Sequence, residues 1–239
     1  MKESYLTDKK YSKFGDMGRY FITKAIIEFG AGVGHGTKVL DVGAGEAPYK
    51  DIFNNCEYHT LDLGVGESEW DYSELTYKAS VYDMPIENNT YDYVLASQLF
   101  EHLAEPKEAM KEVYRILKPG GELFITVPFH QNEHQTPHDY YRYTSFGLKY
   151  ILKESGFENM EIKPMGGRYT RWAIETPNIG SFLPKLKRNG KFYWLGVALI
   201  PVKIIMKAFV LLTQVFFLTI DKFDYKQNDT FNWVVKATK

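Results

Sequence analysis

The chain has very little cysteine, which excludes a fold held together by internal disulfides. Its 239 residues include a single cysteine, Cys56, so no internal disulfide can form and a reducing compartment is expected. The first 16 residues are polar and contain no apolar core of a signal peptide, and the sequence has no internal repeat or low-complexity tract. We therefore expect a cytoplasmic protein with an ordinary core, since 44% of the residues are hydrophobic.

The chain also lacks a strong net charge, which is −1 at pH 7, but the charge is unevenly divided. Residues 1–159 hold 16 basic and 25 acidic side chains, whereas residues 160–239 hold 13 basic and 5 acidic ones. Either the basic third meets an anionic partner, such as a phosphorylated substrate or a lipid, or the two parts attract each other. Because the sequence has no basic-aromatic stripe, we expect no nucleic-acid partner.

The sequence lacks a clean transmembrane segment. Residues 193–220 are apolar with few interruptions, but Pro201 is expected to kink a helix there. At 100° per residue, four polar side chains fall within about 40° of one another and form one polar stripe. They are Lys203, Lys207, Gln214 and Asp221.

A basic cluster comes just before this apolar stretch and consists of Lys185, Lys187, Arg188 and Lys191. A helix with one narrow polar stripe must be buried on most sides or lie in a membrane interface, where basic residues meet anionic lipid. Residues 185–222 therefore have two interpretations. They form a peripheral contact with the inner face of the membrane, or a helix packed on the domain or in a homodimer interface.

Short apolar runs alternate with helical patterns along most of the chain. This alternation predicts βαβ units and a mostly parallel sheet. A lead-in helix is expected over 17–31, and further helices near 47–54, 105–117 and 145–154. Strands are expected near 38–42, 57–61, 79–82, 92–96, 121–127 and 159–164, with strand composition again over 231–237.

The most informative motif is the run Lys-Val-Leu-Asp-Val-Gly-Ala-Gly at residues 38–45. A buried strand is followed by a glycine turn, where the backbone can approach a ligand closely. Asp41, Asp62 and Asp83 each follow or end a predicted strand, where open α/β sheets bind ligands. Asp62 comes about 20 residues after the turn, at the position of a carboxylate that holds ribose hydroxyls. These acids outline a nucleoside-shaped site.

Further motifs follow in order: an apolar strand over 91–96, Phe-Glu-His-Leu at 100–103, and a Pro-Gly-Gly turn at 119–121 that leads into another strand. This series, over residues 35–130, resembles the class I S-adenosylmethionine-dependent methyltransferases. The resemblance implies an α/β, Rossmann-like three-layer sandwich. Its mostly parallel seven-stranded sheet has an antiparallel last strand. One domain would then span 1–239, with a cofactor-binding core over 35–165, a helical insertion over 166–230 and the final strand over 231–237.

The resemblance also implies a role for each residue of the cofactor site. Asp41 would organise the turn, Asp62 would accept from both ribose hydroxyls, and Leu63 would pack on the adenine. The other implied contacts are Gly43, Ala44 and Gly45 under the methionine part, Asp83 and Met84 at the adenine amino group, and Ser97 in the pocket wall. Arg19 either reaches the cofactor carboxylate or serves on the surface. Ala47 stands where a third glycine is common, so a slight change of the turn is expected.

Candidate catalytic residues follow the fourth and fifth predicted strands. His102 is either a general base or, with Glu101, a structural part of the pocket wall. The loop over 130–144 is expected at the acceptor site, with His134 or His138 taking a proton from a hydroxyl and Arg142 holding a phosphate or carboxylate. The alternative is a polar network that orders this loop. No metal site is expected, because Pro137 opposes a helix that would bring His134 and His138 together.

The sequence thus predicts a methyltransferase whose acceptor is a small molecule or glycan, with a sugar hydroxyl on a lipid- or nucleotide-linked sugar preferred. A quinone or other small-molecule acceptor is the alternative within the class. A non-catalytic, cofactor-binding scaffold at a membrane surface is a second alternative. An NAD-dependent enzyme is disfavoured, because Pro48 stands where the dinucleotide pattern has its third glycine.

Overall fold

The computed structural model describes residues 16–66, 70–180 and 193–239. They form two compact units, which are described separately: unit 1 comprises residues up to Met165 together with Asn232–Lys239, and unit 2 comprises Gly166–Phe231. The predicted basic cluster of Lys185, Lys187, Arg188 and Lys191 lies outside the described residues.

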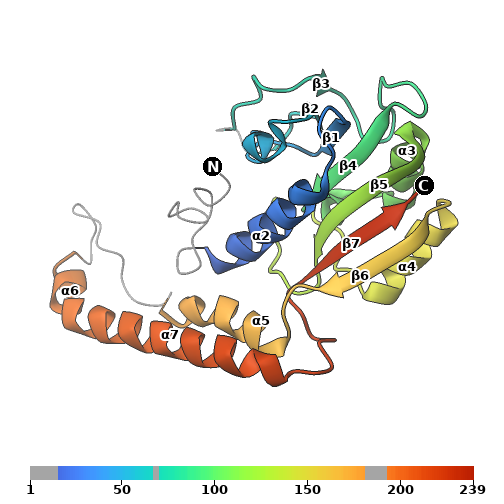
Figure 1. Ribbon diagram of the computed structural model, residues 1–239. Coiled ribbons are helices and arrows are strands. Elements are labelled where there is room, and N and C mark those ends of the chain that lie inside the picture. Colours follow the sequence, from blue (N-terminus) through green and yellow to red (C-terminus); the bar gives the residue numbers. More distant parts are fainter. Residues whose placement is uncertain (1–15, 67–69, 181–192) are drawn as a thin grey trace. The chain divides into compact units, whose positions relative to one another are not determined.

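Unit 1 is built on one sheet, which in the described residues has seven strands in the order β3-β2-β1-β4-β5-β7-β6 (Figure 1). Strand β7 is antiparallel to both of its neighbours, and the other pairs are parallel. The strands are β1 (Lys38–Val42), β2 (Glu57–Asp62), β3 (Tyr77–Lys78), β4 (Tyr91–Ser97), β5 (Leu117–Pro128), β6 (Glu158–Pro164) and β7 (Asn232–Thr238). The predicted mostly parallel sheet with an antiparallel last strand is confirmed.

Helices cover both faces of this sheet and make it the middle of three layers (Figure 1). Side chains of adjacent strand residues point to opposite faces. Val39 therefore packs with the residues of α2 (Met17–Gly32) and η1 (Lys50–Phe53), whereas Leu40 packs with those of α3 (Pro106–Ile116) and α4 (Ser145–Glu154). Because both faces are covered, strands such as β4 are buried along most of their length.

Local sequence explains where these helices begin. The Asp16 carboxylate caps α2 by accepting from the backbone N–H of Arg19, and the Thr144 hydroxyl caps α4 by accepting from that of Gly147. Helix α3 has proline in its first turn, where a missing N–H leaves no intrahelical bond unmade. The helices expected over 17–31, 105–117 and 145–154 are confirmed to within one residue at each end.

Two expected elements of unit 1 differ in the structure. The strand expected near 79–82 is wrong: β3 ends at Lys78, and the backbone N–H of Asp83 donates to the Ser80 carbonyl in a turn. In place of the helix expected near 47–54 the structure has only the short η1, because Ala47 has a φ of 52° and Pro48 follows it. Ala47 therefore adopts the left-handed conformation that favours glycine.

Unit 2 is a helical insertion. Its helices and turns are α5 (Arg168–Glu175), η3 (Thr176–Gly180), α6 (Tyr193–Ala198), α7 (Ile200–Ile220) and η4 (Asp221–Phe223). The expected kink at Pro201 is not seen within α7, because the proline lies in the first turn of that helix, where it is tolerated.

Polar residues of α7 and η4 hold α5 in place. The Asp221 carboxylate accepts from the N–H groups of Gly167 and Thr170 at the start of α5, at 3.0 and 2.9 Å. Gln214 is buried, and its Nε2 donates to the Ala173 carbonyl at 3.1 Å. Part of the predicted polar stripe therefore faces α5 rather than water.

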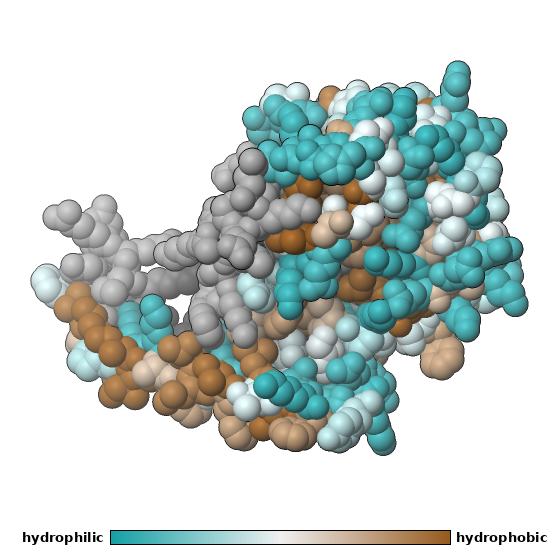
Figure 2. Space-filling model, viewed as in Figure 1, coloured by the Kyte–Doolittle hydropathy of each residue, from teal (hydrophilic) through white to brown (hydrophobic). Residues whose placement is uncertain are grey.

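The opposite side of α7 carries exposed apolar side chains, visible as brown atoms along α6 and α7 in Figure 2. Ile204, Ile205 and Leu212 are 64–70% exposed. Residues 200–223 are long and apolar enough to cross a membrane by length and composition, and only 11% of their most apolar window is buried. An exposed helix of this kind has unused apolar surface for a further contact.

Candidate functional site

The glycine turn after β1 is held close to β2. Gly43 and Gly45 have φ values of 72° and 54°, which glycine adopts without strain. The N–H of Gly43 donates to the Leu61 carbonyl at 2.7 Å. A Cβ on Gly43 would lie 2.8 Å from the Leu99 side chain, so this turn requires glycine for space as well as for its conformation.

Asp62, the last residue of β2, ties this turn to the next one. One carboxylate oxygen accepts from the N–H of Gly45 at 3.0 Å, and the other accepts from that of Gly64 at 2.7 Å. Each oxygen keeps further acceptor capacity, which suits two hydroxyls of a ribose. Leu63 follows with half of its surface exposed, as a residue that packs on a flat ligand requires.

Asp41 lies at the carboxyl half of β1 and is almost completely buried. The hydroxyl of Tyr58 donates to one of its oxygens at 2.5 Å. Burial raises the pKa of Asp41 to about 7; the bond from Tyr58 opposes this rise and the charge of Asp62 adds to it. A cationic group bound here would lower that pKa again, so the pair of carboxyl groups fits a positively charged ligand.

Tyr49 and Trp70 also border the turn, and the sequence analysis did not single them out. Burial raises the pKa of Tyr49 to about 12, against the positive charge of Arg19, so Arg19 lies within electrostatic reach of this region. The Arg19 side chain itself is 43% exposed. A Cβ on Gly45 would lie 3.2 Å from the Trp70 ring. Tyr49 follows the motif by four residues, whereas Trp70 lies 25 residues beyond it, and no local sequence pattern indicates its place at the turn.

Ser97 ends β4, and its hydroxyl shares a hydrogen bond of 2.9 Å with that of Thr126 on β5. The hydroxyl is therefore held between two strands at the carboxyl edge of the sheet. Asp83 and Met84 lie elsewhere, in the loop after β3, where Met84 is buried and Asp83 is exposed.

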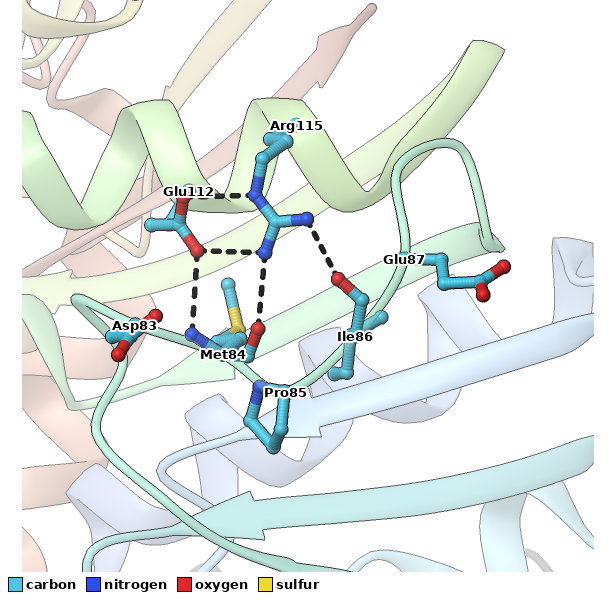
Figure 3. Close-up of a pocket in the computed structure, with 7 residues that line it drawn as sticks. All are labelled: Asp83, Met84, Pro85, Ile86, Glu87, Glu112 and Arg115. Carbon is cyan, nitrogen blue, oxygen red and sulfur yellow. Dashed lines mark hydrogen bonds and ion pairs between the residues drawn. The ribbon is translucent and has the colours of Figure 1, made fainter.

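Asp83 and Met84 line a pocket of about 450 Å³ beside α3 (Figure 3). Across it, Arg115 bonds to Glu112 of the same helix and to the carbonyls of Met84 and Ile86. The bond to Glu112 raises the pKa of Arg115, and the charge of Asp83 adds to this rise. The surroundings of Asp83 are therefore compatible with a solvated carboxylate as well as with a cofactor contact.

Glu101 and His102 follow β4 in η2 (Phe100–His102). The Glu101 side chain is fully buried, and among the described residues neither of its oxygens has a hydrogen-bond partner. Burial raises the pKa of Glu101 to about 8, and burial lowers that of His102. The Nε2 of His102 lies 3.9 Å from a Glu101 oxygen, and its Nδ1 lies 2.6 Å from the His138 carbonyl.

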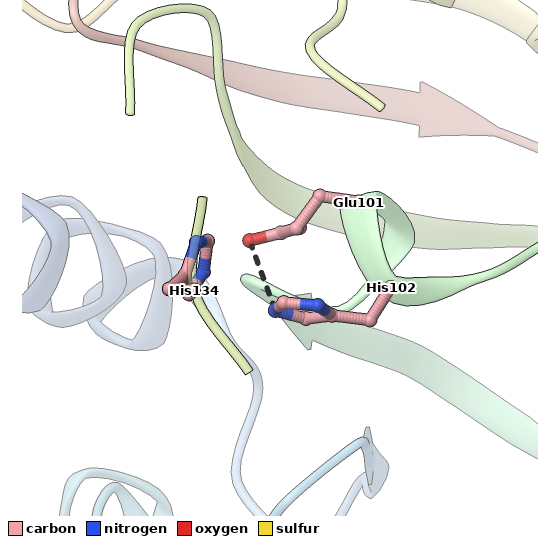
Figure 4. A group of neighbouring side chains, drawn as sticks. All are labelled: Glu101, His102 and His134. Atoms are coloured by element: carbon pink, nitrogen blue, oxygen red, sulfur yellow. Dashed lines mark ion pairs between the residues drawn. The ribbon is translucent and has the colours of Figure 1, made fainter. Parts of the chain in front are cut away.

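The loop over 130–144 brings the His134 side chain to this pair (Figure 4). The rings of His102 and His134 are 4.8 Å apart in an edge-on arrangement. The side chain of His138 is exposed, and its Nδ1 lies 3.2 Å from the Tyr140 hydroxyl. The histidines of the loop therefore occupy different surroundings.

Arg142 orders the loop. Its guanidinium donates to both oxygens of Asp139 and to the carbonyls of Gln131, Asn132 and Tyr141. These bonds use all five N–H groups of the side chain. This geometry supports the alternative of a polar network that orders the loop, while the role of Arg142 in holding a phosphate or carboxylate stays a prediction. The pair also lowers the pKa of Asp139.

Comparisons with known proteins agree with this geometry. A family model described as a methyltransferase domain matches residues 27–125. Similar curated proteins include the ubiquinone biosynthesis O-methyltransferases of Pseudomonas putida (strain W619) and Pseudomonas fluorescens (strain SBW25), at 28% and 26% identity over 138 residues. Each match covers 54% of this chain and 53% of the relative. The chain thus spans about half the length of these curated relatives.

Solved structures share the fold. A SAM-dependent methyltransferase from Archaeoglobus fulgidus matches with a TM-score of 0.58 at 15% identity, over 99% of each chain. The Haemonchus contortus phosphoethanolamine N-methyltransferase 2, solved with S-adenosyl-L-methionine, matches with a TM-score of 0.53 at 18% identity, over 100% of this chain and 59% of that one. Residues 27–125 therefore match a methyltransferase domain, and the fold is that of a solved SAM-dependent methyltransferase.

Proposed function

We propose that this chain transfers a methyl group from S-adenosylmethionine to a hydroxyl of a small acceptor that is itself a lipid or is attached to one. The observation that carries the proposal is the pairing of Asp62 with the glycine turn inside a methyltransferase domain. The bound cofactor supplies an electrophilic methyl group. The chain would then position the acceptor in line with it and exclude water.

The residues near the turn have complementary tasks in this proposal. Asp62 accepts from the ribose hydroxyls, and the buried Asp41 favours the cationic methionine end. Gly43 and Gly45 let the backbone approach the cofactor. The remaining proposed contacts are Ala44, Leu63, Asp83, Met84 and Ser97, with Arg19 within reach of the cofactor carboxylate.

Calorimetric titration with S-adenosylhomocysteine tests the cofactor site. We expect the full chain to bind it, and Asp62→Ala to weaken binding by about a hundredfold or more, since hydrogen bonds to a charged group contribute about 1.5–3 kcal/mol each. Asp51→Ala is the control, because Asp51 is an exposed carboxylate in η1. Equal binding by the full chain and Asp62→Ala would contradict the assignment.

For the acceptor, the named activity of the curated relatives supports a ring hydroxyl of a quinone precursor. The polar and aromatic loop over 130–144 supports a second candidate, a sugar hydroxyl of a lipid-linked glycan. In both cases the proton of the hydroxyl needs an acceptor, and His134, His102 or His138 is the proposed base. Arg142 acts by ordering the loop.

Transfer assays with labelled cofactor distinguish the two acceptors. A polyprenylated catechol represents the quinone precursors, and a lipid-linked sugar represents the glycans. Methylation of the catechol alone would establish the first candidate, and methylation of the sugar alone the second. If neither accepts methyl while S-adenosylhomocysteine still binds, both acceptor classes are wrong and the cofactor site stands.

We further propose that unit 2 contacts the cytoplasmic face of the membrane. The exposed apolar side of α7 supports this, because burying a leucine or isoleucine side chain gains about 1.5–3 kcal/mol. We expect flotation of the full chain with phosphatidylglycerol vesicles, and a loss of affinity of about a hundredfold or more in the double variant Ile205→Asp, Leu212→Asp. Phe146→Asp is the control, an exposed aromatic on α4. No flotation of the full chain would leave a homodimer interface as the alternative.

A further inference from the structure

Glu101 is a buried carboxylate that has no hydrogen-bond partner in the part of the chain that the structure describes. Its side chain is 0% exposed, and both oxygens lack a hydrogen-bond partner among the described residues. Leaving a buried polar group unpaired costs free energy, so such a group calls for an explanation. Figure 4 shows this carboxylate directed toward His102 and His134.

The two histidines are oriented in the same way, although they lie on different segments. Nδ1 of His102 lies 2.6 Å from the His138 carbonyl, and Nδ1 of His134 lies 3.0 Å from the Asn132 carbonyl. A carbonyl only accepts, so each Nδ1 carries the hydrogen and each neutral ring keeps a free lone pair on Nε2. Nε2 of His102 is itself buried and, within the described residues, has no hydrogen-bond partner. Metal-binding histidines are held in this way, with the second nitrogen bonded to a carbonyl or carboxylate.

We propose that Glu101, His102 and His134 form a binding site for one divalent transition-metal ion of the zinc type. Their ligand atoms all lie within 4.8 Å of one another. Ligands about 2.0–2.1 Å from a tetrahedral ion are roughly 3.4 Å apart. The most distant ligand atoms therefore need to approach by up to about 1.4 Å, which His134 can achieve because it lies on a loop and is 30% exposed.

The donor set determines the class of ion. Two imidazole nitrogens and one carboxylate oxygen suit zinc and its neighbours, whereas magnesium and calcium require mostly oxygen ligands. Three protein ligands leave a fourth position open on a tetrahedral ion. None of the three ligands belongs to the glycine turn, so zinc binding can be tested apart from the proposed methyl transfer. With an ion bound to His102 and His134, His138 would be the proposed base.

Titration of the full, untagged chain with zinc chloride tests the site, and the visible absorption of the cobalt-substituted protein reports tetrahedral coordination. We expect one ion per chain. His134→Ala and Glu101→Gln should each weaken binding by more than the 10–100-fold that losing an outer hydrogen-bond partner costs. Glu101→Gln keeps the shape of the side chain, so circular dichroism should report an unchanged fold.

His138→Ala is the matched control. It removes an imidazole from the same loop but keeps the backbone carbonyl that orients His102, so zinc affinity should stay within about threefold of the wild type. Absence of zinc binding by the wild-type chain would overturn the proposal, as would an affinity that His138→Ala abolishes and His134→Ala leaves unchanged. Binding of S-adenosylhomocysteine, measured in parallel, shows separately whether the cofactor site is intact.

Discussion

The two units of the chain place polar and apolar residues in opposite ways. In unit 1, apolar strand residues such as Leu40 and Leu123 are completely buried between helices. In unit 2, the most buried residue of α7 is the polar Gln214, while Leu212 on the same helix is 70% exposed. An apolar helix surface therefore indicates that the helix contacts something, but it does not identify whether that partner is the same chain, a second copy or a membrane.

The same contrast appears in how each unit holds its parts together. Unit 1 relies on packing between sheet and helices, with hydrogen bonds supplied by the strands. Unit 2 relies on side chains that bond to the backbone, such as Asp221 at the start of α5 and Gln214 at Ala173. We expect these two kinds of stabilisation to respond differently to pH and to substitution.

The largest expected effect is that of pH on unit 1. The pKa values of Asp41 and Glu101 rise from 3.8 and 4.5 to about 7 and about 8, so between about pH 4 and 8 the native state binds more protons than the unfolded chain. The contribution of these two groups to the free energy of unfolding of the metal-free protein should therefore fall as pH rises through this range, by at most about 5 kcal/mol per group. Urea unfolding at stepped pH measures this slope.

Asp41→Asn and Glu101→Gln should each flatten that slope, because an amide does not titrate. Asp51→Asn should leave it unchanged, since Asp51 is exposed. A wild-type protein whose stability rises between pH 4 and 8 would show that these two carboxyl groups do not control it.

A pair of leucine substitutions tests the contrast directly. Leu123→Ala in β5 should lower the free energy of unfolding by about 2–5 kcal/mol, because it removes buried volume from the core. Leu212→Ala in α7 should change it by less than about 0.5 kcal/mol in the absence of membranes. Chemical denaturation of both variants measures the difference. Equal losses would mean that Leu212 is buried in solution, as in a homodimer.

The smallest expected effect concerns the polar contact inside unit 2. Gln214→Leu removes the bond to the Ala173 carbonyl and should weaken the packing of α5 on α7 by about 1–2 kcal/mol. Hydrogen exchange of the α5 and α7 amides measures this loss, and Thr219→Val, at an exposed position of α7, is the control. Unchanged exchange in Gln214→Leu would show that the aromatic contacts of Trp172 with Phe217 suffice.

Much of unit 1 was predictable, because its signals are local. The run from Lys38 to Gly45 predicts a strand and a tight turn, and the alternation of elements predicts the sheet. Prediction failed at residues 79–82, where an apolar run forms a turn. It also failed at 47–54, where the glycine-like conformation of Ala47 and the following proline prevent a regular helix.

For this protein the sequence alone determined the order of strands and helices, the glycine turn, and Asp62 at the end of its strand. These features follow from periodicity and backbone preference, which act over a few residues. Only the tertiary structure decided which way the polar stripe faces, that all five N–H groups of Arg142 donate hydrogen bonds within the chain, and that the side chains of His134 and Glu101 lie close together. Such contacts depend on the path of a long loop, and no short-range pattern encodes that path.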